Sequence, residues 1–493
     1  MKSYKIHVED FGLIKSADIT MKPLTIFLGE NNTGKSYIAQ LVYALTRSIS
    51  HRGVSKLLYA HPYFSRDVME SEKQKYKDRT VAAFRRRLPS SWEGNIVKRR
   101  RLDYEIPFRY LPRAIADECE KNFQKYISSM PKYLEEELID AYGVRIKELS
   151  AKLGQGSNFK IDIESEKPKL RIKLGADKNQ LRSIGEIGYS FKETKIKTVI
   201  NPYSYYSLIF RRREIPTEQK LQYLIDLTIR SSIDIFTDIF PEHAYYFPAA
   251  RSGILQGQKL IARAGLRSLK RAGLESISMS KLPGVVVDFL DQIYSIDKDE
   301  HSSMEDLSKE IENKLASGAI GLIERKEELP EIYFNVKNAG RFPLHRTSSM
   351  VSELAPVILM LRYLIEKGDI IILEEPESHL HPKLQIEFAK IVADFIRRGL
   401  NVLITTHSDY FVEQLSNIIA LSSKSEDIKS KLGYQGSSLI YKNEVAAYRF
   451  LHGAKGYTNI NRLKVDESGI SEAGFGEIAE SLYEESIEAK RAE

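Results

Sequence analysis

The sequence predicts an α/β fold, in which strands from both ends of the chain meet in one mixed sheet flanked by helices. An apolar strand at 24–28 runs into a glycine loop and an amphipathic helix. Two more apolar strands, at 370–373 and 401–408, are typical of strands buried on both faces. About 340 residues separate the glycine loop from the end of the strand at 370–373, which predicts a large, mainly helical insertion.

Composition indicates a soluble globular protein of two or three domains. The chain has 493 residues, of which 42% are hydrophobic and 29% charged. No run approaches the ~18 to 20 apolar residues of a membrane span, and the first residues lack the apolar core of a signal peptide. One cysteine, Cys119, excludes an internal disulfide and a cysteine-cluster zinc site. We therefore expect a cytoplasmic protein with no membrane partner.

The glycine loop fits the phosphate-binding pattern G-x-x-x-x-G-K-[ST]. Its glycines let backbone N–H groups curl around phosphate oxygens at a helix N-terminus. Lys35 would reach the β and γ phosphates, and Ser36 would ligate Mg²⁺. An ordinary strand, turn and helix is the alternative. The expected nucleotide-binding residues are Gly29, Glu30, Asn31, Asn32, Thr33, Gly34, Lys35, Ser36 and Tyr37.

Two adjacent carboxylates, Glu374 and Glu375, follow the strand at 370–373. Burying a carboxylate costs several kcal/mol unless a cation or hydrogen bonds compensate. In a phosphate-loop fold the acidic strand is expected beside the loop strand, with its carboxylates facing the metal and the attacking water. We expect Glu374 to contact Mg²⁺ through water and Glu375 to be the general base. The alternative is a solvated acidic turn that includes Glu377.

A histidine, His407, ends the strand at 401–408. A neutral imidazole at the C-terminal edge of a strand can hydrogen-bond a γ-phosphate, although a lone histidine there is usually structural. A zinc site is a further alternative, because His379, His381, His407 and Asp409 are suitable ligands.

The order of these segments resembles that of ABC-type ATPases, and specifically the OLD-like (overcoming-lysogenisation-defect) subgroup. The resemblance is carried by "GENNTGKS", "RTSSMVSELAPVILML" (346–361), "IIILEEPESHLHP" and "LITTHS", together with the opening segment and "AYYFPAARSGI" (244–254). These segments cover about 150 residues at the two ends. The resemblance implies an ABC-type P-loop ATPase head that hydrolyses ATP with Mg²⁺.

The resemblance also implies roles for single residues. His407 matches the family's switch histidine, and Ser348 falls in the signature loop that contacts the γ-phosphate bound by the opposite subunit. Ser349 and Met350 replace small, flexible positions of that loop, which would change the tightness or timing of ATP-driven closure. The same stretch reads locally as a capped, buried helix. A head-to-tail homodimer or a higher homo-oligomer is therefore expected.

The middle of the chain matches the family only loosely. We expect the ATPase core in two parts, at 1–50 and 329–445, with helical inserts at 51–155 and 213–328, β-hairpins at 156–212, and a tail packed on the core at 446–493. In the second insert, basic residues recur at helical spacing as a stripe, which is either solvated surface or a phosphate-tracking surface for double-stranded DNA. The stripe consists of Lys259, Arg263, Arg267, Lys270 and Arg271.

Several related activities are not expected. The insert lacks the persistent heptads of SMC-type and break-repair ATPases, and Cys119 cannot form a zinc hook alone. About 85 residues follow His407 and lack the spaced acidic motif of a TOPRIM nuclease, so we expect no nuclease activity in this chain. The resemblance favours an ATP-driven dimeric switch in antiviral defence or DNA transactions that controls a separate effector. A DNA-binding clamp or motor, whose basic insert tracks duplex, is the alternative.

Overall fold

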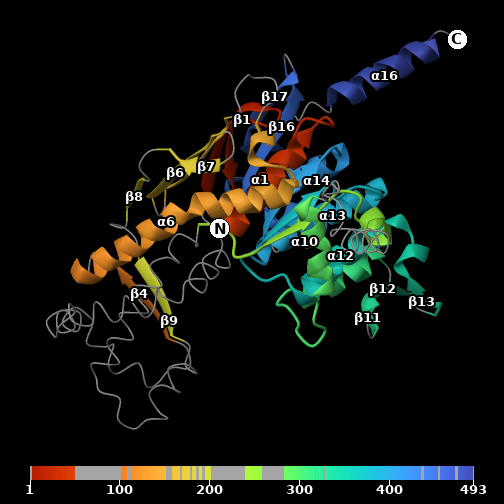
Figure 1. Cartoon of the computed structure of the whole chain (residues 1–493). Helices are drawn as coiled ribbons and strands as arrows, with labels where there is room; N and C mark the ends of the chain where they lie inside the picture. Colours follow the sequence, from red (N-terminus) through yellow and green to blue (C-terminus); the bar gives the residue numbers. More distant parts are fainter. Residues whose placement is uncertain are drawn as a thin grey trace, which may run out of the picture.

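One large mixed sheet organises the molecule (Figure 1). The computed structural model describes residues 3–49, 102–107, 113–150, 158–166, 169–177, 180–184, 188–190, 195–200, 239–257, 283–316, 318–325, 328–336, 338–434, 438–453, 456–471 and 476–491. Within these residues the sheet has twelve strands, and β8 pairs β6 outside the main path. The order along that path is β10 (Ala244–Phe247), β14 (Ile370–Glu374), β15 (Asn401–Thr406), β3 (Leu24–Gly29), β16 (Val445–His452), β17 (Thr458–Leu463), β2 (Ile14–Met21), β1 (Tyr4–Phe11), β5 (Lys160–Glu166), β6 (Lys169–Asp177) and β7 (Gln180–Ser183), with β8 at Gly188–Ser190.

The strands from β10 to β16 are parallel and form the centre of the core. Every residue of β14 and β15 is buried, as expected for apolar strands with helices on both faces. The acidic strand does not lie directly beside the loop strand, because β15 pairs with both β14 and β3. That expectation was wrong in detail, since a hydrophobic pattern identifies buried strands but does not specify their order.

Two hydrophobic cores cover the two faces of the sheet. Alternate residues of β3 divide between them: Phe27 faces one core, and Leu24, Ile26 and Leu28 face the other. The first core is closed by α1 (Lys35–Ile49) and α6 (Arg113–Tyr142). The second is closed by α10 (Gly284–Tyr294), α11 (Glu305–Ile311), α12 (Ser349–Tyr363), α13 (Pro382–Arg397) and α14 (Asp409–Ser422). The predicted mixed sheet flanked by helices is therefore confirmed.

Smaller elements complete the described chain. A separate three-stranded sheet contains β11 (Ala319–Arg325), β12 (Glu328–Val336) and β13 (Gly340–Pro343). The others are β18 (Val465–Asp466), β19 (Gly469–Ile470), α15 (Glu426–Lys431), α16 (Gly476–Arg491), the 3-10 turns η2 (Ile146–Glu148), η4 (Leu344–Arg346) and η6 (Lys442–Glu444), and the π-helical turn η3 (Glu312–Ala316). No helix in the described ranges is long and apolar enough to cross a membrane.

Three segments differ from the helical or peripheral structure that we expected. In 51–155, β4 (Leu102–Pro107) is a strand paired with β9 (Lys195–Ile200), and its alternating apolar and acidic residues suit a strand. In 213–328, β10 belongs to the core sheet. In the C-terminal tail, β16 is a central strand beside β3, whereas α16 projects away from the rest (Figure 1).

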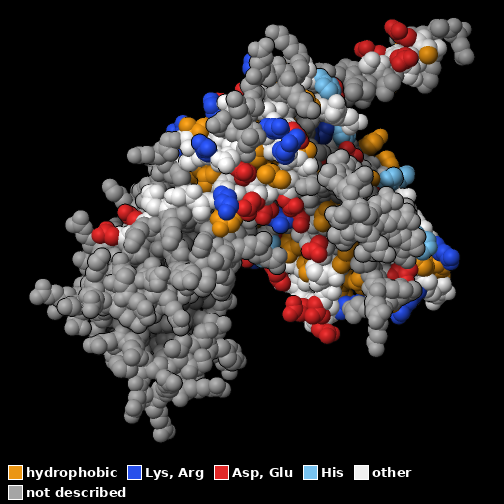
Figure 2. Space-filling view, viewed as in Figure 1, with side chains coloured by type: hydrophobic (Ala, Val, Ile, Leu, Met, Phe, Trp, Pro, Cys, Tyr) orange, Lys and Arg blue, Asp and Glu red, His pale blue; other side chains and the backbone are white. Residues whose placement is uncertain are grey.

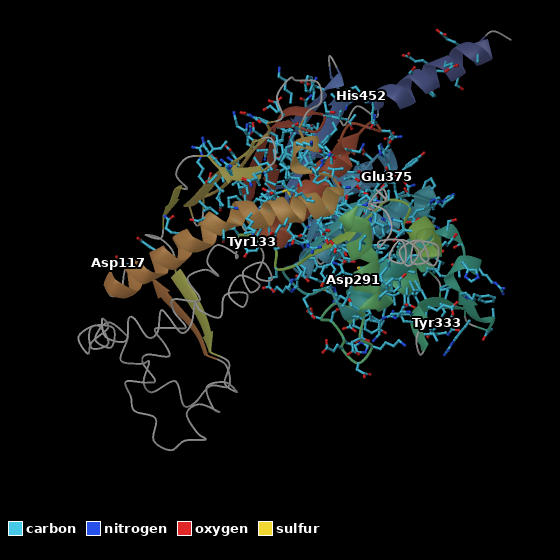
Figure 3. The ribbon with its side chains drawn as sticks, viewed as in Figure 1. Asp117, Tyr133, Asp291, Tyr333, Glu375 and His452 are labelled. Carbon is cyan, nitrogen blue, oxygen red and sulfur yellow. The ribbon has the colours of Figure 1, made fainter. Side chains whose placement is uncertain are left out.

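Helix α1 is tied to both α6 and α10 at the edge of the first core. Arg47 pairs with Glu137 at 2.8 Å and also with Asp288, which accepts a hydrogen bond from Tyr43 Oη at 2.8 Å. Acidic side chains gather over this junction at the centre of the face in Figure 2, and Figure 3 labels Asp291 beside it. The long helix α6 is therefore anchored on the helix that begins at the glycine loop.

Candidate active site

The ends of three parallel strands meet at one cavity of about 470 Å³. Lys35 follows β3, Glu375 follows β14, and His407 follows β15, so residues from both ends of the chain converge there. Figure 3 labels Glu375. The cavity is lined by Gly12, Leu13, Asn31, Asn32, Thr33, Gly34, Lys35, Ser36, Tyr37, Gln40, Glu148, Ser150, Glu375 and His407.

The glycine loop has a backbone that few other residues could adopt. Gly29 has φ +136°, and a Cβ there would lie 2.0 Å from the Phe450 carbonyl oxygen. Gly34 has φ +83°, and Asn32 is also left-handed at φ 61°. The first glycine therefore lets β3 pack against β16, and the second lets the chain turn into α1.

Lys35 closes the loop on itself. Its Nζ donates to the carbonyl oxygens of Gly29 at 2.9 Å and Glu30 at 2.6 Å, and Thr33 Oγ1 donates to the Glu30 carbonyl at 2.7 Å. Burial lowers the pKa of Lys35 to about 8. A phosphate bound beside this side chain would favour its charged ammonium form.

Glu375 presents its carboxylate to the cavity. Its Oε1 lies 3.1 Å from His407 Nε2, and its Oε2 accepts from Ser378 Oγ at 3.3 Å. The hydrogen bond with His407 is the main cause that holds the pKa of Glu375 below its ordinary value. Glu375 is non-glycine at φ 42°, an unfavourable backbone that turns the chain away from β14. It is an ionised acceptor beside the glycine loop.

Glu374 has a different environment from its neighbour. It is 6% exposed and is not among the cavity-lining residues. Its Oε1 accepts from Tyr246 Oη at 2.7 Å, and its Oε2 accepts from the Ala249 N–H at 3.0 Å. Both oxygens accept hydrogen bonds from protein donors, an arrangement compatible with the expected water-mediated contact with Mg²⁺.

The alternative of a solvated acidic turn does not hold. Glu377 is 8% exposed, and its Oε1 accepts from Thr406 Oγ1 at 2.7 Å and from the His407 N–H at 2.8 Å. Glu377 therefore fixes the backbone that carries His407. Only Glu375 of the three carboxylates lines the cavity.

A buried ion pair that the sequence analysis missed lies behind the acids. Arg251 Nε lies 3.0 Å from Glu353 Oε2, and the side chains are 3% and 1% exposed. Arg251 Nη1 donates to the Glu374 carbonyl oxygen at 2.9 Å, and Ser252 Oγ donates to Glu353 Oε1 at 2.7 Å. The pair joins α12 to the end of β14. The adjacent arginine and serine in "AYYFPAARSGI" were a signal for it, since a charge following a buried strand requires a partner.

Ser348 is the N-cap of α12, and its Oγ accepts from the Val351 N–H at 3.3 Å. The predicted buried face of this helix is confirmed at Leu354, Val357, Ile358 and Leu361. Ser348 and Ser349 are exposed and do not line the cavity of their own chain.

Two further expectations from the sequence are the zinc site and the basic stripe. No three His, Cys, Asp or Glu side chains of the described residues form a group that could hold a metal ion, so the zinc alternative is not supported. His381 Nδ1 instead accepts from the Lys383 N–H at 3.3 Å as the cap of α13. The basic stripe of Lys259, Arg263, Arg267, Lys270 and Arg271 lies outside the described residues.

The parallel core, the glycine loop and the cavity that Glu375 lines together define a P-loop ATPase head. A family model described as "AAA ATPase domain" matches residues 1–412, and the chain belongs to this family. It is therefore an ATPase of this type. No curated protein matched the sequence.

Three solved structures are similar to this chain only at a low level. An SmcHead bound to the C-winged helix domain of ScpA has a TM-score of 0.37 and 10% identity, over 94% of this chain and 99% of that one. An Smc head domain with an extended coiled coil, bound to the C-terminal domain of ScpA derived from Pyrococcus furiosus, has 0.34 and 11%, over 99% of both chains. The SMC head domain from Thermotoga maritima has 0.31 and 9%, over 94% and 100%. The family assignment does not depend on them.

Proposed function

We propose that the chain is an ATP-driven dimeric switch, in which Glu375 is the catalytic base. The observation that carries this proposal is the convergence of Lys35, Glu375 and His407 on one cavity, although about 340 residues separate the first two. Family membership supports an ATPase. The role of each residue is inferred from its position in the cavity.

The phosphates of ATP would lie along the glycine loop. Backbone N–H groups at the start of α1 and the Lys35 ammonium would neutralise their charge. For Lys35 this requires exchanging its bonds to the Gly29 and Glu30 carbonyls for phosphate oxygens. The loop therefore already holds the cation at the place where the triphosphate needs it.

Hydrolysis would use a water between Glu375 and the γ-phosphate. The water oxygen forms a bond to the γ-phosphorus as the bond to the bridging oxygen breaks, and Glu375 takes the proton. His407 would exchange its hydrogen bond with Glu375 for one to the γ-phosphate. That exchange frees the carboxylate only when nucleotide is present.

The residues present fit a magnesium ion. Mg²⁺ usually keeps several waters and takes one or two protein oxygens along with phosphate oxygens. Ser36 lines the cavity and would be the direct ligand, and Glu374 would act through a water. When bound, the ion neutralises charge on the phosphate oxygens.

A second copy of the chain would complete the site. Ser348 is exposed at the start of α12 and lies outside its own cavity, as a residue that contacts a partner's γ-phosphate should. Two copies packed head to tail would each bury ATP against the other's α12. Ser349 and Met350 in this segment favour slow turnover.

The biological setting follows from the OLD-like resemblance. We infer that closure and release of the dimer control a separate protein effector, in antiviral defence or a DNA transaction. The motions would reach the effector through the inserted segments, because α6 is anchored on α1 by Arg47.

The test combines turnover with oligomeric state. Glu375→Gln should keep ATP binding, stop hydrolysis and accumulate an ATP-dependent dimer that sedimentation velocity detects. Lys35→Ala should give neither binding nor dimer. Glu413→Gln on the exposed side of α14 is the control and should behave as wild type. Unchanged turnover in Glu375→Gln would reject the catalytic assignment, and a monomer under all conditions would reject the switch.

A further inference from the structure

The end of the inserted helix α6 forms one wall of the cavity. The chain leaves α6 at Tyr142, makes the 3-10 turn η2 and places Glu148 and Ser150 in the cavity lining. The glycine loop, Glu375 and His407 account for the phosphate end of a bound nucleotide. The wall formed by Leu13, Tyr37, Glu148 and Ser150 is left for the nucleoside.

Contacts within the protein hold this wall in place. The Leu149 carbonyl accepts from the Gly12 N–H at 2.8 Å and from Tyr37 Oη at 3.3 Å. Ser150 forms an antiparallel bridge with Phe11, and Leu149 is fully buried. The position of Glu148 is therefore set by the same turn and helix that shape the rest of the cavity.

The α6 end is also joined to the residue that follows the glycine loop. Tyr142 Oη donates to the Tyr37 carbonyl oxygen at 2.5 Å, and the two rings lie 4.6 Å apart. Phe11 packs against both tyrosines. Figure 1 shows α6 running from this junction toward the β4–β9 ribbon, and Figure 3 places Asp117 near its far end.

Glu148 is an oriented carboxylate with one oxygen committed. Arg145 Nε and Nη2 donate to its Oε1 at 3.0 and 2.9 Å. Both donors use the same oxygen, so Oε2 takes no part in this pair. The hydrogen bonds from Arg145 hold the pKa of Glu148 below its ordinary value, so at neutral pH the group only accepts hydrogen bonds.

The charge of this carboxylate selects what can lie beside it. A phosphate would be repelled, whereas adjacent hydroxyl groups can donate to it. We propose that Glu148 accepts hydrogen bonds from the ribose hydroxyls of the nucleotide, with Leu13 and Tyr37 packing nearby as the apolar part of the wall. This inference rests on the proposed function, and it makes the inserted helix part of the nucleotide site.

The test compares ATP with 2′,3′-dideoxy-ATP, which lacks both hydroxyls. The dissociation constants would be measured by calorimetry with full-length wild type, Glu148→Gln and Glu148→Ala. We expect wild type to prefer ATP by about tenfold, since a hydrogen bond to a charged group has about this effect. In Glu148→Ala the preference should vanish, because ATP binding weakens and dideoxy-ATP binding does not. Glu148→Gln should retain part of it.

A matched control is Glu164→Ala. Glu164 also pairs with an arginine, at 2.7 Å to Arg171 Nε, but lies on β5 and does not line the cavity. It should keep the full preference for ATP. Equal weakening of both ligands in Glu148→Ala, or no preference in wild type, would overturn the ribose assignment. If Lys35→Ala binds ATP as tightly as wild type does, the proposed function itself fails. Binding that requires Lys35 but ignores Glu148 rejects only this inference.

Discussion

The His407 imidazole and the Glu375 carboxylate lie 3.1 Å apart, Nε2 to Oε1, in a cavity that the glycine loop also lines. The two residues end neighbouring parallel strands, so their separation depends on the pairing of β14 with β15. The contact lowers the pKa of the Glu375 carboxyl group and also occupies its Oε1. This relationship gives the proposed base its first test.

His407→Ala should slow hydrolysis by about 10²- to 10³-fold, because a contact with the γ-phosphate and the orientation of the base are both lost. The pKa of Glu375 should rise when this hydrogen bond is removed. Since the base must be ionised, the acid limb of the kcat profile should move to higher pH. Steady-state turnover between pH 4 and 9 measures both effects. His301→Ala removes an exposed contact with Glu305 and should change neither.

The pKa of Lys35, about 8, predicts how nucleotide affinity depends on pH. The free protein loses the lysine proton as pH rises through 8, whereas bound phosphate favours the ammonium. Binding should take up a proton near pH 8, and the Kd for ATP should rise by up to about tenfold between pH 7 and 9. Calorimetry in buffers of different ionisation enthalpy measures the uptake. A Kd that stays constant over this range contradicts the shift.

The lowered pKa of Lys35 also predicts the direction in which the free energy of unfolding changes with pH. The ordinary lysine pKa is 10.5, so between pH 8 and 10.5 the unfolded chain binds more protons at this position. Lys35 therefore contributes stability that rises with pH across that window. Denaturant titrations of wild type and Lys35→Met at pH 8 and pH 10 measure this effect. The difference between their free energies of unfolding should be smaller at pH 10.

Glu374 and Glu375 should respond oppositely to truncation. Glu374→Ala leaves Tyr246 Oη and the Ala249 N–H without their acceptor, and should lower the free energy of unfolding by about 1–3 kcal/mol. Glu375→Ala removes a partly exposed group and should change stability little while abolishing turnover. Urea denaturation of both variants is the measurement. Equal losses of stability would contradict the division of roles.

The Arg251–Glu353 pair should be costly to break. Glu353→Ala leaves a buried guanidinium unpaired and should destabilise the protein by about 3–5 kcal/mol. Turnover should also fall in the folded fraction, since Arg251 supports the Glu374 carbonyl. Glu387→Ala removes a half-exposed pair with Lys390 and should cost about 0–1 kcal/mol. A small effect of Glu353→Ala would show that the pair is dispensable.

Reversing the basic stripe distinguishes the switch from the DNA clamp. Changing Lys259, Arg263 and Arg267 to Glu should leave ATP turnover and effector capture unchanged if the chain is a switch. A clamp would instead bind duplex DNA with a strong salt dependence that these changes abolish. Fluorescence anisotropy with labelled duplex at 50 and 200 mM salt is the measurement.

The sequence by itself determined the chemical groups of the candidate site. The glycine spacing, the adjacent acids and the histidine after an apolar strand are local patterns, because each depends on residues within one strand and its following loop. The same holds for the buried face of α12, whose apolar residues recur at helical spacing. These patterns also predicted a mixed sheet flanked by helices.

The tertiary structure decided which of these groups meet. Strand order placed β15 between β14 and β3, and brought β16 from the tail into the centre. The backbone is left-handed at Glu375, and the two neighbouring carboxylates have different surroundings. Glu374 contacts Tyr246, whereas Glu375 lines the cavity. The Glu148 wall came from the end of an inserted helix. Such contacts depend on packing between segments that lie far apart in the sequence, and a local pattern carries no information about the distant partner.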